Sequence, residues 1–347
     1  MRLRALKSSL LLCVLYAGAA ASLRLDAIGP NLAGILDDPV WDFTAYPQLN
    51  CLDSQWLAGG ELLADDRYCL FGRNPGPVSV GAVLPMTLGA RGDVRLAVPL
   101  SVRTGGLTLG ATTWVPTWLT PSADTFHRWW HNHYWASTFD WSGYVGCHWA
   151  NPKVSLDAGV AMTFQEVTNW TVSDSVVTVR SRERSQGQTP AVRLTLSRGR
   201  MVLRAIVSYQ HWFYDEAEYV PRITPMLTQS ADLTVGFVWR PTERGTLTAA
   251  VRARLHSPLG PPFPHLTERA LDVPVGIEFN TYGTVTTWRL GVDVQYDSDQ
   301  LREQAFHRHL YAGFAVNLPR YLLIEFLPSL DDASVLTDWE IAATVRF

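Results

Sequence analysis

Beyond its first 21 residues the sequence lacks any run approaching the roughly 18–20 uninterrupted apolar residues that a transmembrane helix requires. Charge is also scarce, since only 18% of the residues are charged and the formal net charge is −3. This balance argues against a nucleic-acid partner. The chain is nonetheless 47% hydrophobic and contains 14 Trp. Because a bilayer accepts only helices and closed barrels, a chain of this kind that enters a membrane must form a barrel.

Cysteine is rare as well, with four residues in the chain. Cys13 lies in an apolar core behind three leucines and does not follow small residues, so a lipoprotein anchor is not favoured. Export favours oxidation, and a disulfide between Cys51 and Cys69 is one of two open alternatives, the other being free thiols. Cys147 is then left over and is interpreted as a small lipid-facing residue, not as a catalytic thiol.

The amino end has the pattern of a secretory signal peptide. Arg2, Arg4 and Lys7 precede a short apolar core, and Ala19 and Ala21 form an A-x-A cleavage site. Cleavage after Ala21 is expected. Residues 1–21 are therefore assigned to a signal peptide, and the protein is predicted to leave the cytoplasm.

The carboxyl end reads DWEIAATVRF, with one apolar and one polar face at a period of two. It stops on Phe347. This ending resembles the closing strand of outer-membrane β-barrels, and the resemblance implies recognition of Phe347 by the barrel assembly machinery. We therefore expect an all-β transmembrane antiparallel barrel in the cell outer membrane, with the lipid bilayer as a partner.

From residue 78 onward, period-two runs alternate with turn residues. They predict about 14 strands over residues 78–347. The runs are 78–90, 94–102, 107–119, 134–149, 154–166, 191–198, 201–213, 231–239, 247–257, 271–279, 285–296, 307–318, 321–327 and 336–347.

The connections alternate between tight turns and longer segments, and only the turn at 91–93 is short where a long loop is due. Bacterial barrels have short periplasmic turns, longer extracellular loops and an even strand number. The alternation therefore predicts extracellular long loops. Segment 176–183 would break the even number, and we interpret it as a strand extension or hairpin arm within loop 167–190.

With the apolar face of each strand assigned to lipid, the other face carries charges of both signs. Two interpretations stay open: pairs that hold the barrel shape, or a basic stripe that guides anionic solutes. The Trp residues near strand ends fit an interfacial girdle. The predicted lumen charges are Arg95, Arg103, Asp157, Arg193, Arg204, Arg252, Arg254, Asp272, Glu278, Arg289, Asp293, Asp338, Glu340 and Arg346, and the girdle candidates are Trp135, Trp149, Trp239, Trp288 and Trp339.

An aromatic cluster spans Phe126 to Trp135, mainly in a predicted extracellular loop. Phe126, Trp129, Trp130 and Tyr134 are the candidates for capturing an apolar ligand, and packing of the loop is the alternative. Three nearby histidines suggest a metal, but no carboxylate or Cys is arranged with them. We predict neither a metal nor a cofactor.

Residues 22–77 precede the first predicted strand and are expected to form a periplasmic or lumen-plug segment. A 14-stranded barrel has room for such a segment. A barrel of this size with an amino-terminal hatch resembles the FadL-like long-chain fatty-acid transporters. The stretch from Asp37 to Leu49 has acids and aromatics in comparable order, but Tyr46 and Gln48 depart from the family's Asn-Pro-Ala. The hatch candidates are Asp38, Phe43, Tyr46 and Pro47.

The resemblance implies passive uptake of small hydrophobic molecules past the hatch. A diffusion porin for hydrophilic or anionic solutes is the alternative. A lipid-modifying enzyme or a surface adhesin is less favoured, because histidines such as His211, His307 and His309 have no recognisable nucleophile partner. We therefore expect a transporter or channel and not an enzyme.

Overall fold

The computed structural model describes most of the chain after residue 22. The described residues are 23–38, 41–52, 56–63, 67–87, 95–104, 106–116, 127–129, 132–173, 176–217, 226–259, 268–281, 285–298, 305–318, 322–330 and 336–346. Within them no helix is long and apolar enough to cross a membrane.

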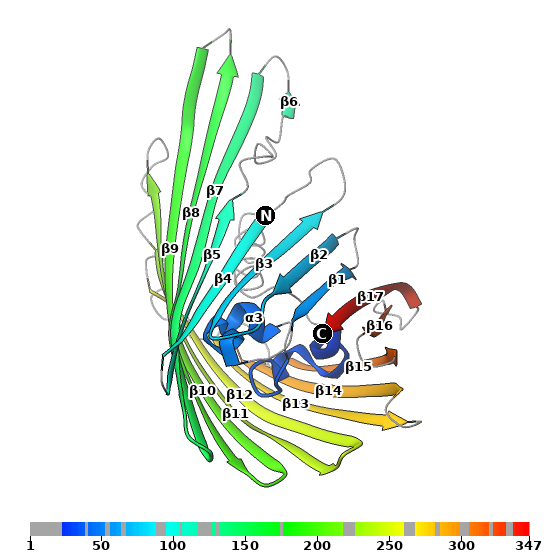
Figure 1. The fold of residues 1–347 in the computed structure, drawn as a ribbon. Coiled ribbons are helices and arrows are strands. Elements are labelled where there is room, and N and C mark those ends of the chain that lie inside the picture. The colour runs from blue at the N-terminus through cyan, green and yellow to red at the C-terminus, as the bar shows by residue number, and fades with distance from the viewer. Residues whose placement is uncertain are drawn as a thin grey trace.

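The strands form one closed antiparallel barrel (Figure 1). Except at β6, each strand pairs with its neighbours in the sequence, and β1 also pairs with β17. The short β6 pairs only with β7, while β5 pairs directly with β7, so 16 of the 17 described strands form the wall.

The first half of the described wall ends in very long strands. The bounds are β1 (Leu57–Leu63), β2 (Arg67–Arg73), β3 (Val78–Thr87), β4 (Arg95–Thr104), β5 (Leu107–Pro116), β6 (His127–Trp129), β7 (Asn132–Ala150), β8 (Val154–Ser173) and β9 (Val176–Arg198). About 9–11 residues suffice for a tilted strand to span a bilayer. Strands β8 and β9, with 20 and 23 residues, therefore extend well beyond it, and Figure 1 shows β7 to β9 projecting past the rest of the wall.

The second half completes the closure. Its strands are β10 (Met201–Ala217), β11 (Met226–Thr242), β12 (Gly245–Leu259), β13 (Glu268–Thr281), β14 (Thr286–Ser298), β15 (Ala305–Leu318), β16 (Leu322–Leu330) and β17 (Leu336–Arg346). The pairing of Leu57 with Arg346 places the start of β1 beside the end of β17.

The predicted count of 14 strands is wrong, because β1 and β2 lie within residues 22–77, the segment expected to precede the barrel. Their sequences, LAGGELL and RYCLFGR, alternate poorly. Gly59 faces the ring of Phe71, where an added Cβ would lie 2.6 Å from the ring. Leu57 and Phe71 are buried apolar side chains, so the inner face of the wall here mixes apolar residues with the buried Arg73.

Segment 176–183 belongs to β9, which confirms its interpretation as a strand extension. The expected loop at 167–190 is wrong, since β8 continues to Ser173 and β9 begins at Val176. Their ladder contains a register shift between Asn169 and Trp170. The sequence predicts a loop here because the alternation weakens where both faces become polar.

The alternation of faces is otherwise confirmed. Outward positions such as Leu109, Val145 and Leu290 are about half exposed, whereas Asp157, Asp272 and Asp293 are almost fully buried on the inner side. Three predicted girdle residues are exposed near the short-turn end: Trp149, Trp239 and Trp288. The side chains of Trp135 and Trp339 lie outside the described set.

The residues before β1 form short helices on the inner face of the wall, which Figure 1 shows in blue. They are α2 (Leu23–Ile28), the 3-10 helix η1 (Pro30–Leu32), α3 (Trp41–Ala45) and the 3-10 helix η2 (Pro47–Leu52). Helix α2 contacts β13 to β17, η1 contacts β12 and β13, and η2 contacts β3, β4, β5 and β7. The segment therefore reaches opposite sides of the barrel.

Candidate functional site in the barrel interior

We name residues 23–38 the first half of the inner segment and residues 41–52 its second half. The first half docks through an apolar cluster. Leu32, Ile35 and Leu36 have no measurable exposure. They pack with Val238 of β11 and Ala250 of β12, which face inward from the wall. Burying each such side chain contributes about 1.5–3 kcal/mol, so this cluster is a strong anchor.

Glycines on the inner face let the segment approach the wall closely. A Cβ added at Gly291 would lie 1.8 Å from the carbonyl oxygen of Ile28. One added at Gly110 would lie 2.1 Å from the backbone nitrogen of Gln48. Gly81 faces the ring of Phe43, with 2.3 Å to its Cζ. Any side chain at these positions would displace the segment.

A ladder of alternating charges ties α2 to the wall. Arg24 donates from Nε and Nη2 to the two carboxylate oxygens of Glu278, at 2.8 and 2.5 Å. Glu278 also accepts from Nε of Arg289 at 2.9 Å, and Arg289 pairs with Glu325 at 2.6 Å. The ladder joins the segment to β13, β14 and β16. It also neutralises the lumen charge of Arg289.

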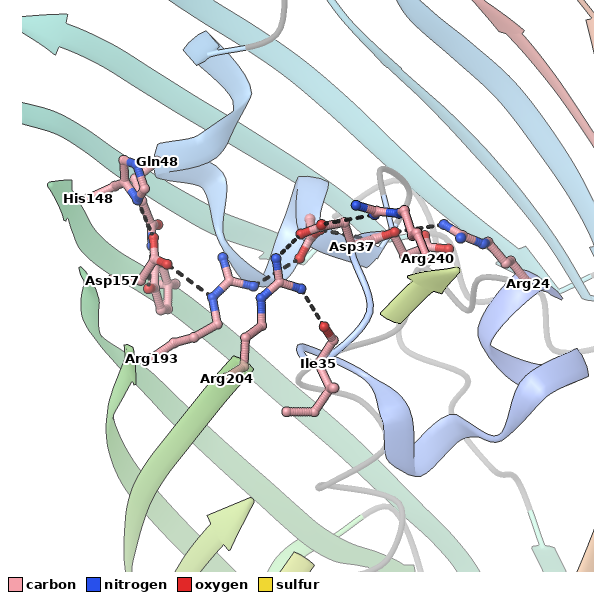
Figure 2. Close-up of polar contacts among 12 residues, drawn as sticks. Arg24, Ile35, Asp37, Gln48, His148, Asp157, Arg193, Arg204 and Arg240 are labelled. Atoms are coloured by element: carbon pink, nitrogen blue, oxygen red, sulfur yellow. Dashed lines mark hydrogen bonds and ion pairs between the residues drawn. The ribbon is translucent and has the colours of Figure 1, made fainter. Parts of the chain in front are cut away.

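Arg204 of β10 holds the end of the first half. Its guanidinium donates to the backbone carbonyl of Ile35 and pairs with the Asp37 carboxylate. Arg24 also donates to the Asp37 carbonyl, at 2.6 Å. Figure 2 shows these two arginines converging on the same turn of the segment.

The second half docks on a buried polar cluster centred on Asp157 of β8. Asp157 accepts from Nε of Arg193 at 3.0 Å and lies 2.8 Å from Nδ1 of His148 (Figure 2). Gln48 of η2 reaches the same carboxylate at 3.5 Å and the Tyr144 hydroxyl at 3.2 Å. One inner-segment amide is thus bound to two neighbouring wall strands, β7 and β8.

Arg193 extends this cluster to α3. Its guanidinium lies 3.8 Å from the centroid of the Tyr46 ring and 3.5 Å from the Asp42 carboxylate. Burial raises the pKa of Asp42 to about 7, although Arg193 opposes the shift. Asp42 also accepts from the Asp38 amide at 3.0 Å. The second half therefore docks through charge and hydrogen bonds.

Other lumen charges pair within the wall. Arg252 is bound to Asp232 at 2.5 Å, and Arg254 to Asp272 at 2.9 Å. Arg252 also donates to Asn31 at 3.1 Å, and Asn31 donates to Asp293. This pairing favours the interpretation that lumen charges hold the barrel together.

The four hatch candidates, Asp38, Phe43, Tyr46 and Pro47, are all buried in the inner segment. The lumen candidates Arg204, Arg252, Arg254, Arg289 and Asp293 lie on the inner side, and Glu340 is half-buried and has an interaction partner. Arg103 is exposed near the end of β4. The side chains of Arg95, Asp338 and Arg346 lie outside the described set.

Of the capture candidates, Phe126 and Trp130 lie outside the described residues. Trp129 lies in β6 and Tyr134 in β7, whose short ladder includes His127 opposite Tyr134. Their side chains are not described. Cys51 is buried and free, which excludes its disulfide with Cys69, and Cys147 is also free. No group of three or more His, Cys, Asp or Glu among the described residues could hold a metal ion.

Sequence reasoning missed several docking residues of the inner segment. Arg24, Asn31 and Gln48 are isolated polar residues in a stretch without periodicity, so no pattern indicated their wall partners. Gly110 and Gly291 could have been identified, since both lie on the lumen-facing side of the alternating pattern, where a polar side chain is expected. A gap in the lumen-facing pattern was the available signal.

No family model and no curated protein sequence matches this chain. Solved structures do. CdiB from Escherichia coli is similar with a TM-score of 0.52 at 12% identity, over 95% of this chain and 75% of that one. CdiB from Acinetobacter baumannii has a TM-score of 0.48 at 9% identity, over 84% of this chain. This chain spans 59% of that CdiB chain.

The Pseudomonas putida toluene transporter TodX is also similar, with a TM-score of 0.46 at 12% identity over 94% of this chain and 97% of that one. The resemblance to outer-membrane β-barrels that the sequence suggested is thus confirmed at the level of fold. At these identities the similarity shows the fold, which is that of an outer-membrane β-barrel.

Proposed function

We propose that the protein is a passive outer-membrane channel for small hydrophobic molecules, in which residues 23–52 form a plug. The observation that carries the proposal is the docking of this segment on opposite sides of the inner wall, through α2 on one side and η2 on the other. A segment held in this way obstructs the lumen. TodX, a toluene transporter, supports a hydrophobic cargo only by analogy of fold.

The orientation follows from the connection lengths. Short connections such as 105–106, 151–153 and 199–200 lie at the end where β1 begins and β17 ends. We place this end in the periplasm, together with Phe347 for the assembly machinery, and the long connections outside. The aromatic residues Phe126, Trp129, Trp130 and Tyr134 would then capture the cargo at the extracellular end.

Deletion of residues 23–52 tests the plug. The deletion spares β1, and it should raise single-channel conductance in planar bilayers severalfold. The matched control is Asp38→Asn in the full chain. This variant keeps the apolar anchors Leu32 and Leu36 and should conduct like the full chain. Unchanged conductance after the deletion would exclude a plug.

The cargo requires a separate test. Uptake of a radiolabelled long-chain fatty acid by cells that produce the protein should fall when Phe126, Trp129 and Trp130 are changed to Ala. Trp288→Ala, on the lipid-facing girdle, is the control. Equal loss in both variants would contradict capture by the loop.

The diffusion porin remains the alternative transport function. Because Arg252, Arg254 and Arg289 are each paired with carboxylates, the lumen offers little free positive charge for anions. Reversal potentials in a salt gradient distinguish the two. Strong anion selectivity that is lost in Arg252→Ser would favour the porin.

A further inference from the structure

The short-turn end of the wall carries a concentration of positive charge. Four consecutive connections at this end join β4 to β5, β7 to β8, β9 to β10 and β11 to β12. Within residues 103–107, 150–154, 197–201 and 239–245, the only described acid is Glu243. We name the exposed cations at the mouth of the barrel the basic arc: Arg103, Lys153, Arg200, Arg240 and Arg244. Arg198 is left out, because it lies on the outer face with Leu196.

Hydrogen bonds between neighbouring strands hold the four connections side by side. The Lys153 carbonyl accepts from the Ser197 amide at 2.8 Å, and the Arg200 carbonyl accepts from the Arg240 amide at 2.9 Å. The direct pairing of β5 with β7 brings the first connection beside the second. The basic arc therefore follows the ends of eight of the 16 wall strands as one continuous surface.

The charges of the basic arc are not neutralised, in contrast to those of the lumen. In the lumen Arg252, Arg254 and Arg289 are each paired with a carboxylate. Within the described part of the chain, no side chain forms a hydrogen bond or ion pair with three members of the arc: Arg103, Lys153 and Arg244. The Arg200 guanidinium donates to the Pro241 carbonyl, which leaves its charge unbalanced. A group of exposed like charges favours an anionic partner.

The arginines of the arc face the mouth of the barrel and not the lipid. On the lipid side of this rim, the girdle residue Trp239 is exposed. Two positions before Arg103, Ser101 is buried on the inner face, so Arg103 lies on that face. In the same way the buried Val238 places Arg240 on the inner face. A lipid therefore meets the girdle, whereas a soluble molecule at the mouth meets the arginines.

The inner segment shows which chemistry the arc accepts. Arg240 lies 4.0 Å from the Asp37 carboxylate, and Figure 2 shows the two residues beside each other. Both side chains are about half exposed, at 50% and 54%. A contact this long and this open to solvent neutralises little of the arc's charge. A carboxylate thus approaches the lumen edge of the arc, and the other cations are accessible to further carboxylates.

The dimensions of the arc favour an extended acidic segment over a small anion. Successive connections at this end are two strands apart. With strands about 4.8 Å apart and tilted by about 45°, this separation is about 14 Å. The whole arc then spans about 40 Å, which equals about 12 residues of extended chain. A single small anion could contact one connection, whereas an acidic segment could contact all four.

We propose that the basic arc is the docking surface for an acidic segment of a periplasmic protein. Carboxylates of this segment pair with cations across the four connections, and one of them competes with Asp37 for Arg240. Complementary charge of this kind sets the association rate and the choice of partner. This inference rests on the proposed orientation, with the short-turn end in the periplasm, and not on the proposed cargo.

Fluorescence anisotropy tests the surface, with the full-length protein in phosphatidylcholine nanodiscs and a labelled peptide of about 16 glutamates, slightly longer than the arc. The wild type should bind the peptide, and Arg200→Gln with Arg244→Gln should weaken binding about tenfold. Raising the ionic strength from about 0.03 to 0.3 M should also weaken wild-type binding about tenfold, since it shortens the Debye length about threefold.

The matched control is Arg269→Gln with Arg308→Gln. This pair removes the same charge from exposed residues at the opposite end of the wall. It should bind the peptide like the wild type.

Two further measurements locate the peptide. Hydrogen exchange should slow in residues 198–201 and 239–245 when the peptide binds, and residues 305–312 should be unchanged. Asp37→Asn should bind the peptide more tightly, because it frees Arg240 from its competing carboxylate. Weaker binding by this variant would contradict the competition.

Four results would overturn the proposal. They are no binding of the peptide by the wild type, equal losses in the arc variant and its control, displacement of the peptide by inorganic phosphate at constant ionic strength, and retention of phosphatidylglycerol by the wild type that is lost in the arc variant. The third would indicate a small-anion site, and the fourth would indicate that lipid headgroups occupy the arc.

Discussion

The two halves of the inner segment dock on the same wall by different physical means. The first half buries Leu32, Ile35 and Leu36 against inward-facing apolar residues of β11 and β12. The second half meets a polar wall, where Gln48, Asp42 and Tyr46 approach Asp157 and Arg193. The first half also has the ion pairs of Arg24 and Arg204, but its apolar cluster persists when salt or pH weakens them, whereas the contacts of the second half named here are polar. We therefore predict that the second half is released from the wall more readily than the first half.

Unpaired polar atoms occur beside both halves, at Arg204 and Asp293 beside the first half and as a group beneath η2. The buried oxygens of Gln48, Thr108 and Thr112 have no hydrogen-bond partner within the described residues. All three lie where η2 packs on β5. Each unsatisfied group costs about 1–3 kcal/mol, and hydration on release recovers that cost. The second half should therefore exchange its amide hydrogens faster than the first half.

The largest effect is expected from Arg193→Gln. It leaves Asp157 and Asp42 without their guanidinium, and breaking a buried pair costs about 3–5 kcal/mol. Hydrogen exchange should accelerate in residues 41–52, by at least a hundredfold, with residues 23–36 nearly unchanged. Arg198→Gln, an exposed residue at the end of β9, is the control. Equal acceleration of both halves would show that they dock as one unit.

Leu32→Ala should accelerate hydrogen exchange in the first half and not in the second. Truncation of this fully buried side chain leaves a cavity and costs about 2–5 kcal/mol. Exchange should accelerate in residues 23–36, and bilayer recordings should show brief openings. Leu52→Ala, at a side chain that is 42% exposed, is the matched control. If residues 41–52 of the variant keep their protection from hydrogen exchange while residues 23–36 lose it, the two halves dock independently.

Gly291→Ala should loosen α2 by overpacking, at a cost of about 1–3 kcal/mol. The new Cβ would lie 1.8 Å from the Ile28 carbonyl oxygen, so the helix must shift. Gly106→Ala, where an added Cβ meets nothing within 4 Å, should leave exchange unchanged. Equal exchange rates in the two variants would contradict close docking at β14.

The smallest effect is a dependence on pH confined to the second half. Burial raises the pKa of Asp42 to about 7, against the charges of Arg193 and Arg204 and with those of Asp37 and Asp38. The docked state therefore favours the protonated carboxyl, so docking is strongest below the ordinary pKa and weakens as pH rises through 7. Between pH 6 and 8 exchange of residues 41–52, corrected for intrinsic rates, should rise about tenfold. Asp42→Asn should abolish this rise.

Much of the wall could be predicted from the sequence. Fourteen of the wall strands and the 176–183 extension follow from alternation, because the two faces of a membrane wall meet different solvents. Strands β1 and β2 could not be predicted in this way. Their inner face contacts packed side chains such as Leu57 and Phe71 and not water, so the alternation is lost.

The inner site was less predictable. The alternation along the strands identified the lumen-facing charges Asp157, Arg193 and Arg204 but not their partners in the inner segment. Asp38, Phe43, Tyr46 and Pro47 came from a resemblance, and all are buried as a docked segment requires. Contacts such as Arg24 with Glu278 join residues 254 positions apart, and no local pattern encodes such a separation.

By itself the sequence determined that this chain builds a barrel wall, because the alternation of apolar and polar residues shows which side chains face the lipid. Only the tertiary structure decided how many strands close the wall, which charges pair, and which connections gather the cations of the basic arc. Those outcomes depend on residues brought together by closure. Local alternation specifies a face, whereas register and contact across the lumen depend on the whole ring of strands.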